Sequence, residues 1–203
     1  MSKTIKTLII FTIIFLLGIM ARDIITGSGT QSHYGTIEDP VQEDVIGEPF
    51  VKIESGGNTY KLTKKASYYI EAVVKSKKKY TRDLSSAISN YDFALAWGEL
   101  NEPEIDEHVD YSQSGRWYYY KYDSSTPVSK AYIGQHSANV HLIPANDLVA
   151  KQISKVTVND LVELEGYLVY VKGENFTWNS SLTRNDTGDG ACEILYVEKI
   201  TVK

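Results

Sequence analysis

Two histidines, His136 and His141, lie five positions apart in the segment QHSANVHLIP, residues 135–144. A histidine near its ordinary pKa can take up a proton at ambient pH, so either ring could act as the general base of a hydrolase. A spacing of five places two side chains on opposite faces of a regular strand, which argues against their binding one metal ion together. We therefore expect no metal site and no cofactor, and His136 could instead orient a substrate or water together with Asn139.

The single cysteine, Cys192, is the second candidate for chemistry. A cysteine attacks as its thiolate, which at neutral pH needs a nearby imidazole or positive charge, and His136 could supply it. The neighbours Ala191, Ile194 and Leu195 are apolar, and a lone cysteine on such a strand is more often a small buried hydrophobe. A chain with one cysteine forms no internal disulfide, so the domain depends on its core.

The segment WNSSLTRNDTGDGACE, residues 178–193, is rich in polar side chains. Asp186 begins the tripeptide Asp-Thr-Gly of aspartic proteases, but polar neighbours replace the apolar strands that bury the carboxylate pair of those enzymes. Residues 185–190 imitate a calcium-binding loop only in part, because the series of ligands is interrupted. The simplest interpretation is a glycine-containing turn in which Arg184 pairs with a carboxylate such as Glu193.

These two segments, together with YDFALAWG (91–98) and RWY (116–118), resemble a family of uncharacterised bacterial proteins. The motifs that carry the resemblance read HSANxHLIPA and WxSSLxRxDTGxGACE, and the likeness spans most of residues 60–197. That family has no assigned activity. The resemblance therefore implies the extent of the domain and a bacterial source, and it assigns no catalytic residue.

Aromatic and polar side chains also suit a binding site. Residues 117–120 present ring faces that fit a sugar or a peptide, although alternate residues of a strand must face the core. We expect a ligand-binding face that combines the two polar segments, made of His136, Asn139, Trp178, Ser180, Arg184 and Asp186.

The elements that position these residues are predicted to be mostly strands. Fifteen Tyr and three Trp against two Met and five Pro favour a pleated sheet. Alternating apolar residues predict strands at 68–74, 117–122, 131–144, 156–158, 161–171 and 191–202. The apolar run 93–97 could be helix or strand.

Two short helical stretches have cap signals. Asp83 can cap residues 84–88, and Asn146 or Asp147 can cap a helix with Leu148, Val149 and Ile153 on one side.

The pattern V-x-V-x-D-x-V-x-L-x-G-x-L-V of residues 156–169 resembles the late strands of OB-type barrels, where a glycine such as Gly166 permits strong coiling. We expect a mainly β (α+β) fold, a partly open OB-like β-barrel with one or two short helices, preceded by an N-terminal apolar helix.

Lys3 and Lys6 precede an uncharged, apolar stretch at residues 7–21. As a helix it would be about 22 Å long, short of the roughly 30 Å of a bilayer core, so it could be a signal peptide or a short anchor. The lysines predict a cytoplasmic N-terminus and an extracytoplasmic domain, which is secreted if the segment is cleaved. The alternative is a buried core helix.

We expect three parts in the chain: a signal anchor or signal peptide at 1–22, a polar linker at 23–58 and a β-rich globular domain at 59–203. Within the linker, Phe50, Val51 and Ile53 alternate with polar residues over a few positions and could form a short docked strand.

The charge balance, a net −5, disfavours a polyphosphate partner. We expect a membrane-anchored extracytoplasmic binding module that recognises a protein or envelope ligand. The first alternative is a hydrolase with His136 or His141 as base, assisted by Asp186, Arg184 or Cys192. The second is a single-stranded nucleic-acid-binding domain that uses the five basic residues of 75–82, although the acidic total makes nucleic acid an unexpected partner.

Overall fold

The computed structural model describes residues 34–186, 188 and 190–203. The predicted apolar helix at 7–21 and the first part of the predicted linker lie outside the described residues. Within the described part of the chain, no helix is long and apolar enough to cross a membrane.

The described chain is mainly β, as its composition predicts, with three α-helices and two 3-10 helices. Its strands are β1 (Val41–Glu43), β2 (Phe50–Ser55), β3 (Asn58–Lys79), β4 (Tyr91–Ala96), β5 (Val109–Ser114), β6 (Trp117–Tyr122), β7 (Ser137–Pro144), β8 (Leu161–Lys172), β9 (Thr177–Asn179) and β10 (Glu193–Val202). Its helices are η1 (Leu84–Ala87), η2 (Glu99–Asn101), α2 (Pro103–Asp106), α3 (Lys130–Gln135) and α4 (Asp147–Lys155).

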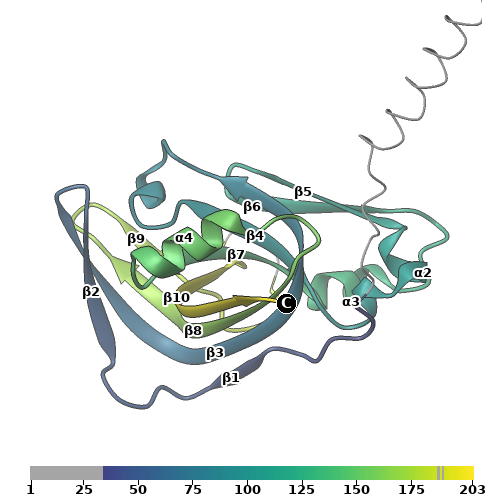
Figure 1. Ribbon diagram of the computed structural model, residues 1–203, viewed down its shortest axis with the longest axis horizontal. Helices are drawn as coiled ribbons and strands as arrows, with labels where there is room; N and C mark the ends of the chain where they lie inside the picture. The colour runs from purple at the N-terminus through teal and green to yellow at the C-terminus, as the bar shows by residue number, and fades with distance from the viewer. Residues whose placement is uncertain (1–33, 187, 189) are drawn as a thin grey trace, which may run out of the picture. The chain divides into compact units, whose positions relative to one another are not determined.

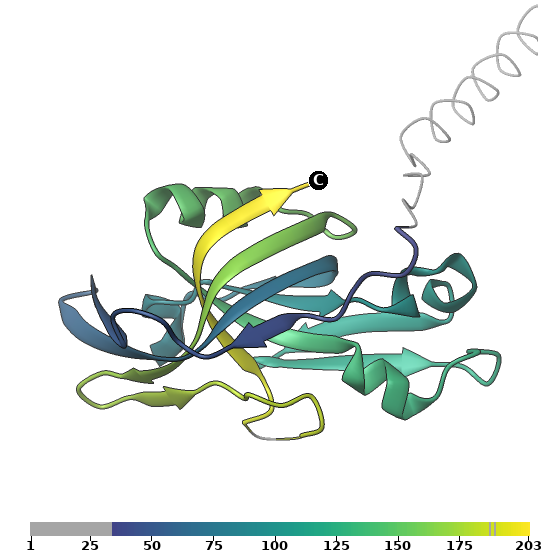
Figure 2. The ribbon, with the colours of Figure 1, turned by 90° about the horizontal axis from the view of Figure 1, so that it is seen from below.

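Five strands pair in an order that returns to its starting strand. β3 pairs with β4, β4 with β7, β7 with β10, β10 with β8, and β8 with β3. All these pairs are antiparallel except β7 and β10, which run parallel. The main core lies between these strands and includes Ile70, Phe93, Val140, Leu164 and Leu195. Figure 1 shows the long β3 bending around the core, and Figure 2 shows β8 and β10 beside β3.

Gly166 marks a place where β8 and β10 approach too closely for a side chain. A Cβ atom at this position would overlap the carbonyl oxygen of Tyr196. The register of β10 against β8 shifts between Val197 and Lys199, next to the same contact. The sequence predicts an interior kink at this glycine, and the close approach of the two backbones is its physical reason.

The compact unit includes all described residues from Tyr34 onward, which moves the domain boundary from the predicted position at 59. β1 and β2 both pair with β3, and the predicted short strand near Phe50 is β2. Ile37 is buried in the main core and its backbone pairs with Gly98. The sequence predicts too little structure here because short strands in a polar segment carry almost no periodicity.

A separate hairpin, β5 with β6, covers the outer face of β4 and β7. The Gln113 side chain donates a hydrogen bond to Asn139 Oδ1 (2.6 Å), and Asn139 Nδ2 donates to the carbonyl of Arg116 (2.9 Å). An apolar cluster that includes Leu100 and Ile133 fills the space between the hairpin and the short helices. Figures 1 and 2 show α2 and α3 beside this hairpin, away from α4.

Both predicted caps are confirmed. Asp83 accepts a hydrogen bond from a backbone N–H at the start of η1, and Asn146 does the same for α4. Val149 and Ile153 are buried, but Leu148 is 67% exposed, which corrects the prediction that all three share one side. Residues four apart lie on the same helix face, whereas the residue before them is rotated away from it.

Two predicted strands differ from the structure. The segment 131–144 begins as helix α3 and becomes a strand only at β7, because Ser129 caps a helical turn and Ile133 packs under the hairpin. Residues 156–158 form a connection and not a strand. The undecided run 93–97 belongs largely to strand β4.

Candidate functional site

Two adjoining pockets lie between the β5–β6 hairpin and the chain that leads into β10. The first, which we name the Glu193 pocket, has a volume of about 310 Å³ and is bordered by β6, α3 and the start of β10. The second, the Trp178 pocket, has a volume of about 380 Å³ and is bordered by the hairpin turn, β7, β8 and β9. Trp117, Gly188 and Cys192 border both pockets, so the two adjoin along these residues.

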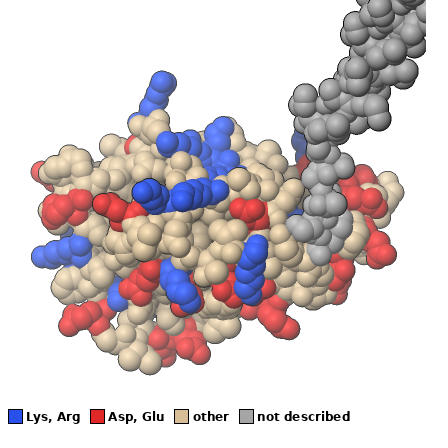
Figure 3. Space-filling model, viewed as in Figure 1, with Lys and Arg blue, Asp and Glu red and all other residues tan. Residues whose placement is uncertain are grey.

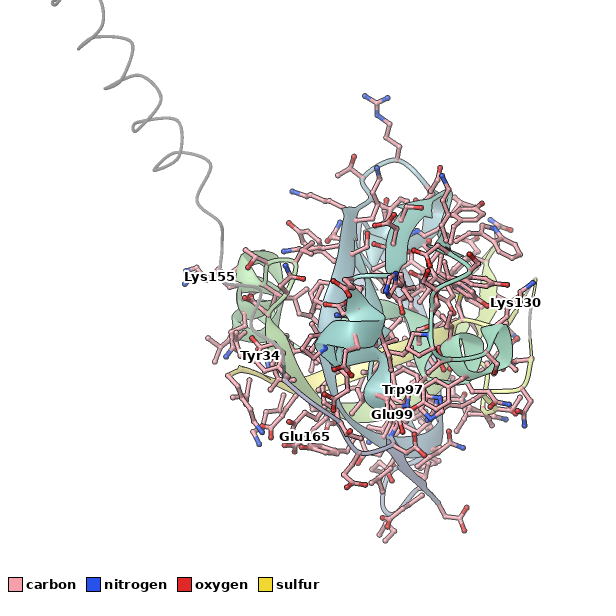
Figure 4. The ribbon with its side chains drawn as sticks, turned by 90° about the vertical axis from the view of Figure 1, so that its right-hand side faces the viewer. Tyr34, Trp97, Glu99, Lys130, Lys155 and Glu165 are labelled. Atoms are coloured by element: carbon pink, nitrogen blue, oxygen red, sulfur yellow. The ribbon has the colours of Figure 1, made fainter. Side chains whose placement is uncertain are left out.

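The side chains of β6 form an aromatic wall of the Glu193 pocket. Trp117, Tyr118 and Tyr120 all border it, and the Tyr118 hydroxyl donates a hydrogen bond to the carbonyl of Ser137 (3.1 Å). Lys130 of α3 also borders the pocket and lies at the edge of the domain in Figure 4. The predicted aromatic strand therefore directs part of its rings to a pocket.

Glu193 is the buried acid of this pocket. Its side chain is 5% exposed, Oε1 accepts a hydrogen bond from Arg184 Nη1 (3.3 Å), and Oε2 has no hydrogen-bond partner among the described residues. Burial raises the pKa of Glu193 to about 7 against the opposing effect of the Arg184 guanidinium, and the Asp186 carboxylate adds to the increase. A carboxyl group that titrates near neutral pH at a pocket can exchange a proton with a bound molecule.

Arg184 pairs with Glu193, as the sequence predicts. Its guanidinium also lies over two rings, 5.5 Å from the centroid of Tyr68 and 5.2 Å from that of Trp97, a fully buried residue. Asp186 borders the same pocket. The pocket therefore combines two carboxylates with one guanidinium and, at its exposed edge, the ammonium group of Lys130.

Cys192 lies between the two pockets as a protonated thiol. Burial raises its pKa to about 11, against a hydrogen bond from Asn139 Nδ2, which is 3.7 Å from the sulfur. The sulfur also lies 4.0 Å from the carbonyl of Arg116. His136, the imidazole predicted to activate it, stacks on Tyr132 with centroids 3.8 Å apart and borders neither pocket. The structure thus does not bring the predicted nucleophile and base together.

His141 borders the Trp178 pocket and belongs to a buried cluster of charged residues on the outer face of β4 and β7. Asp92 is fully buried, and its Oδ1 accepts a hydrogen bond from Arg116 Nη1 (2.6 Å). Arg116 also donates to Asp83 from Nη2 (2.8 Å) and Nε (3.2 Å). Asp92 Oδ2 lies 2.9 Å from His141 Nδ1, a close contact without hydrogen-bond geometry. The Trp178 ring covers His141 at 4.4 Å between centroids.

Arg116 holds this cluster from an unusual backbone position. The two-residue hairpin turn of Gly115 and Arg116 has φ values of 59° and 72°, as a type I′ turn requires. A non-glycine residue rarely adopts such a φ, and here Tyr80 and Asn139 hold its N–H and carbonyl. Sequence reasoning missed Arg116 and Asp92. The letters SGRW between two alternating segments were the available signal for a tight hairpin turn.

The six residues of the predicted ligand-binding face fall into two groups. Trp178, Arg184 and Asp186 border the pockets. Ser180 is buried, and its hydroxyl accepts a hydrogen bond from the N–H of Ile194 (3.0 Å), so it supports the start of β10. The other two residues, Asn139 and His136, lie under the hairpin and on the end of α3, as described above.

The lysines near the end of β3 have structural partners. Lys75 pairs with Asp106 at 2.6 Å with both side chains buried, and burial lowers the pKa of Lys75 against the opposing effect of Asp106. Lys77 donates to three carbonyls at the end of α4, where a helix favours a cation. On the face in Figure 3, basic and acidic side chains are interspersed. These contacts count against a continuous basic groove along residues 75–82.

Within residues 34–186, 188 and 190–203, no group of three or more His, Cys, Asp or Glu side chains is arranged to hold a metal ion. Comparison of the chain with protein-family models, with curated proteins and with solved structures gives no significant match. Geometry and chemistry of the two pockets are therefore the grounds for a functional assignment.

Proposed function

We propose that this protein is a membrane-anchored, extracytoplasmic binding module of OB type that takes a ligand of the cell envelope into the two adjoining pockets. One observation carries the proposal: the pockets lie side by side over the outer face of β7, between the hairpin turn and the segment 173–192. Loops that are positioned by a rigid sheet are a common place for ligand recognition.

The order of strand pairing supports the OB assignment. A long first strand, β3, pairs with both β4 and β8, the third and fifth strands (β7 and β10) run parallel, and helix α4 stands between β7 and β8. In such barrels the ligand lies on the second and third strands and is held by the loops between strands 1 and 2 and strands 4 and 5. The equivalent parts are β4 and β7 with residues 80–90 and 173–192, which include Asp83 and Trp178.

The groups around the Trp178 pocket suit a polar ligand with flat apolar faces, such as an oligosaccharide or a short peptide. Trp117, Tyr170 and Trp178 offer ring surfaces, and Thr177 and Asn179 offer a hydroxyl and an amide. The guanidinium beside them, that of Arg116, is already paired with two carboxylates. A polyanion would therefore find little free positive charge, which counts against a nucleic-acid ligand.

The membrane tether rests on the sequence. Residues 7–21 are apolar and follow two lysines, a pattern typical of a signal anchor or signal peptide with its N-terminus in the cytoplasm. A binding module carried outward by this segment meets envelope polymers first, and these define the expected ligand.

The experiment measures binding of soluble bacterial cell-wall fragments to the full-length protein in lipid nanodiscs, by its tryptophan fluorescence. Two of the three tryptophans, Trp117 and Trp178, border the pockets, so occupancy should change the emission. We expect Trp178→Ala to weaken binding about tenfold or more. Tyr119→Ala is the matched control, because Tyr119 is exposed on the same strand as Trp117 and borders neither pocket.

Two results would contradict the binding proposal. One is equal binding by Trp178→Ala and the parent protein. The other is tighter binding of a single-stranded oligonucleotide than of the cell-wall fragments at physiological salt, which would favour the nucleic-acid alternative.

One observation favours a hydrolase as second candidate. His141 has a carboxylate, that of Asp92, beside Nδ1 and borders the Trp178 pocket, an arrangement that can orient a general base. His136 borders neither pocket, so His141 is the base in this alternative. Release of products from the same cell-wall fragments, abolished by His141→Gln while binding is retained, would support it. Absence of turnover by the parent protein would exclude it for these substrates.

A further inference from the structure

The Glu193 pocket contains a carboxylate oxygen that the described residues leave without a hydrogen bond. Glu193 Oε2 is buried and has no hydrogen-bond partner within the described residues, while Oε1 is held by Arg184 at 3.3 Å. Buried polar atoms are nearly always hydrogen-bonded, because an unmet acceptor loses its water without compensation. Since Glu193 borders the pocket, a donor group on a bound molecule is the available partner.

The unpaired oxygen of Glu193 can accept a hydrogen bond from a cationic donor. Four charged residues border the pocket, and two of them, Asp186 and Lys130, are exposed, so the charges inside it are the carboxylate of Glu193 and the guanidinium of Arg184. The other titratable groups that face Glu193, Tyr68, Tyr118 and Cys192, have pKa values raised by burial and are neutral near pH 7.

Lys130 is the remaining charged residue of the lining. It is exposed, so solvent screens its charge from the buried carboxylate. The same screening applies to Asp186, so an added ammonium group would bind mainly through the free oxygen of Glu193.

The opposite wall suits the same kind of group. Trp117, Tyr118 and Tyr120 border the pocket along β6. The faces of aromatic rings attract ammonium groups, and several rings around one carboxylate are a recurrent way to bind them.

We propose that the Glu193 pocket binds an organic ammonium group, seated between the aromatic wall of β6 and the carboxylates of Glu193 and Asp186. This rests on the proposed function, because it names the chemical group that the envelope ligand presents. An amino sugar and the amino terminus of a peptide both carry such a group.

Binding should be linked to a proton. Burial and Asp186 hold the pKa of Glu193 near 7 against Arg184, and an ammonium group binds the ionised form. The fraction of ionised Glu193 rises about tenfold between pH 6 and pH 8, so the apparent affinity for the ammonium group should rise about tenfold over that interval. Binding at pH 7 should release about half a proton per site, because about half of the Glu193 side chains are already ionised there.

The experiment is titration calorimetry of the full-length protein in nanodiscs with n-butylammonium, 1-butanol and butyrate, at pH 6 and pH 8. We expect heat of binding from n-butylammonium alone, about tenfold tighter at pH 8, with proton release seen as a dependence on the ionisation enthalpy of the buffer. Glucosamine and glycylglycinamide, used next, distinguish the two sources of the amine by which one binds more tightly.

Glu193→Gln should abolish n-butylammonium binding, whereas Glu198→Gln should not. Glu198 is the matched control because it is exposed on the same strand. If Glu193→Gln fails to fold, the proton release of the parent protein still decides the matter. Equal binding of butanol and n-butylammonium, tighter binding of butyrate, or unchanged affinity from pH 6 to pH 8 would overturn the proposal.

Failure of this inference is distinguishable from failure of the proposed function. Cell-wall fragments that bind through Trp178 while n-butylammonium does not would remove the ammonium site and leave the binding module. Absence of binding by both probes would remove both.

Discussion

Two buried acid–arginine pairs in the described part of the chain differ in how many groups surround the acid. Asp92 Oδ1 accepts a hydrogen bond from Arg116 (2.6 Å), Oδ2 lies 2.9 Å from His141 Nδ1 without hydrogen-bond geometry, and Arg116 is in turn fixed by Asp83. Glu193 has one side-chain partner, Arg184 at 3.3 Å, beside its own backbone N–H, and its Oε2 has no hydrogen-bond partner among the described residues.

This difference suggests a structural role for the pair of Asp92 and Arg116 and a binding role for the pair of Glu193 and Arg184. The Asp92 cluster joins three elements, β4, β7 and the hairpin turn, so its energy holds the hairpin against the outer face. The Glu193 pair lies at the start of one strand with its free oxygen at a pocket. An acid held by contacts to several elements fixes a structure, whereas an acid with a free oxygen at a pocket can bind a ligand.

The largest expected loss of stability follows from removing Asp92, the acid that pairs with Arg116. Asp92→Ala should lower the free energy of unfolding by about 3–5 kcal/mol, because Arg116 loses its fully buried partner. Asp83→Ala should cost less, about 1–2 kcal/mol, since that carboxylate is 38% exposed and the variant loses the cap of η1 as well as the ion pair. Urea denaturation monitored by circular dichroism measures both, and equal costs would contradict the assignment of Asp92 as the structural acid.

The titration of Glu193 should make the free energy of unfolding depend on pH. The pKa of Glu193 is raised to about 7 in the folded protein, so the folded state binds more protons than the unfolded state between about pH 4.5 and pH 7. Its contribution to stability therefore falls as pH rises through this window and stays constant above it, by about 3 kcal/mol in total.

Glu193→Gln should remove that decrease and leave the contributions of other groups. The measurement is the difference between the two unfolding free energies at pH 5 and at pH 8. A constant difference between the proteins would show that Glu193 titrates alike in the folded and unfolded states.

Replacing each arginine by lysine should give smaller losses of stability, and their order compares the two pairs. Arg116→Lys should cost about 2 kcal/mol, because an ammonium group cannot reach Asp83 and Asp92 with the geometry of a guanidinium. Arg184→Lys should cost less, about 1 kcal/mol, since Arg184 makes one long hydrogen bond with Glu193 and a lysine can keep a positive charge near the rings of Tyr68 and Trp97. Thermal unfolding of both variants tests the order, and a larger loss for Arg184→Lys would reverse it.

The smallest effect is on the reactivity of Cys192. Its pKa is raised to about 11, so its thiolate fraction at pH 8 is about a hundredfold below that of a thiol with a pKa of 9. Alkylation by iodoacetamide should therefore be slow and should rise with pH up to about 11. A ligand in either pocket should slow it further, because Cys192 borders both. Rapid labelling at pH 7 would indicate an activated nucleophile and support the hydrolase.

Most strands and two helix caps were predictable, because apolar alternation and cap residues act locally. β6, β8 and β10 follow from such patterns, and so do the caps at Asp83 and Asn146. The pairing of Arg184 with Glu193 was also predictable, since both charges belong to one turn-containing segment.

The Asp92 cluster was not predictable in the same way. It depends on the register that sets Asp92 opposite His141 and on a hairpin that brings Arg116 across from another part of the chain. Helix α3 was missed because its six residues gain their stability from the packing of Ile133 under the hairpin. Tertiary contacts of this kind leave no periodic trace in the sequence.

The most direct test is the titration of the Glu193 carboxyl carbon by nuclear magnetic resonance, with and without n-butylammonium. We predict a midpoint near pH 7 in the free protein and a lower midpoint when the amine is bound, because the added positive charge stabilises the carboxylate. A midpoint near 4.5 in the free protein, or one that the amine leaves unchanged, would contradict the account of Glu193 as the open acid of a binding pocket.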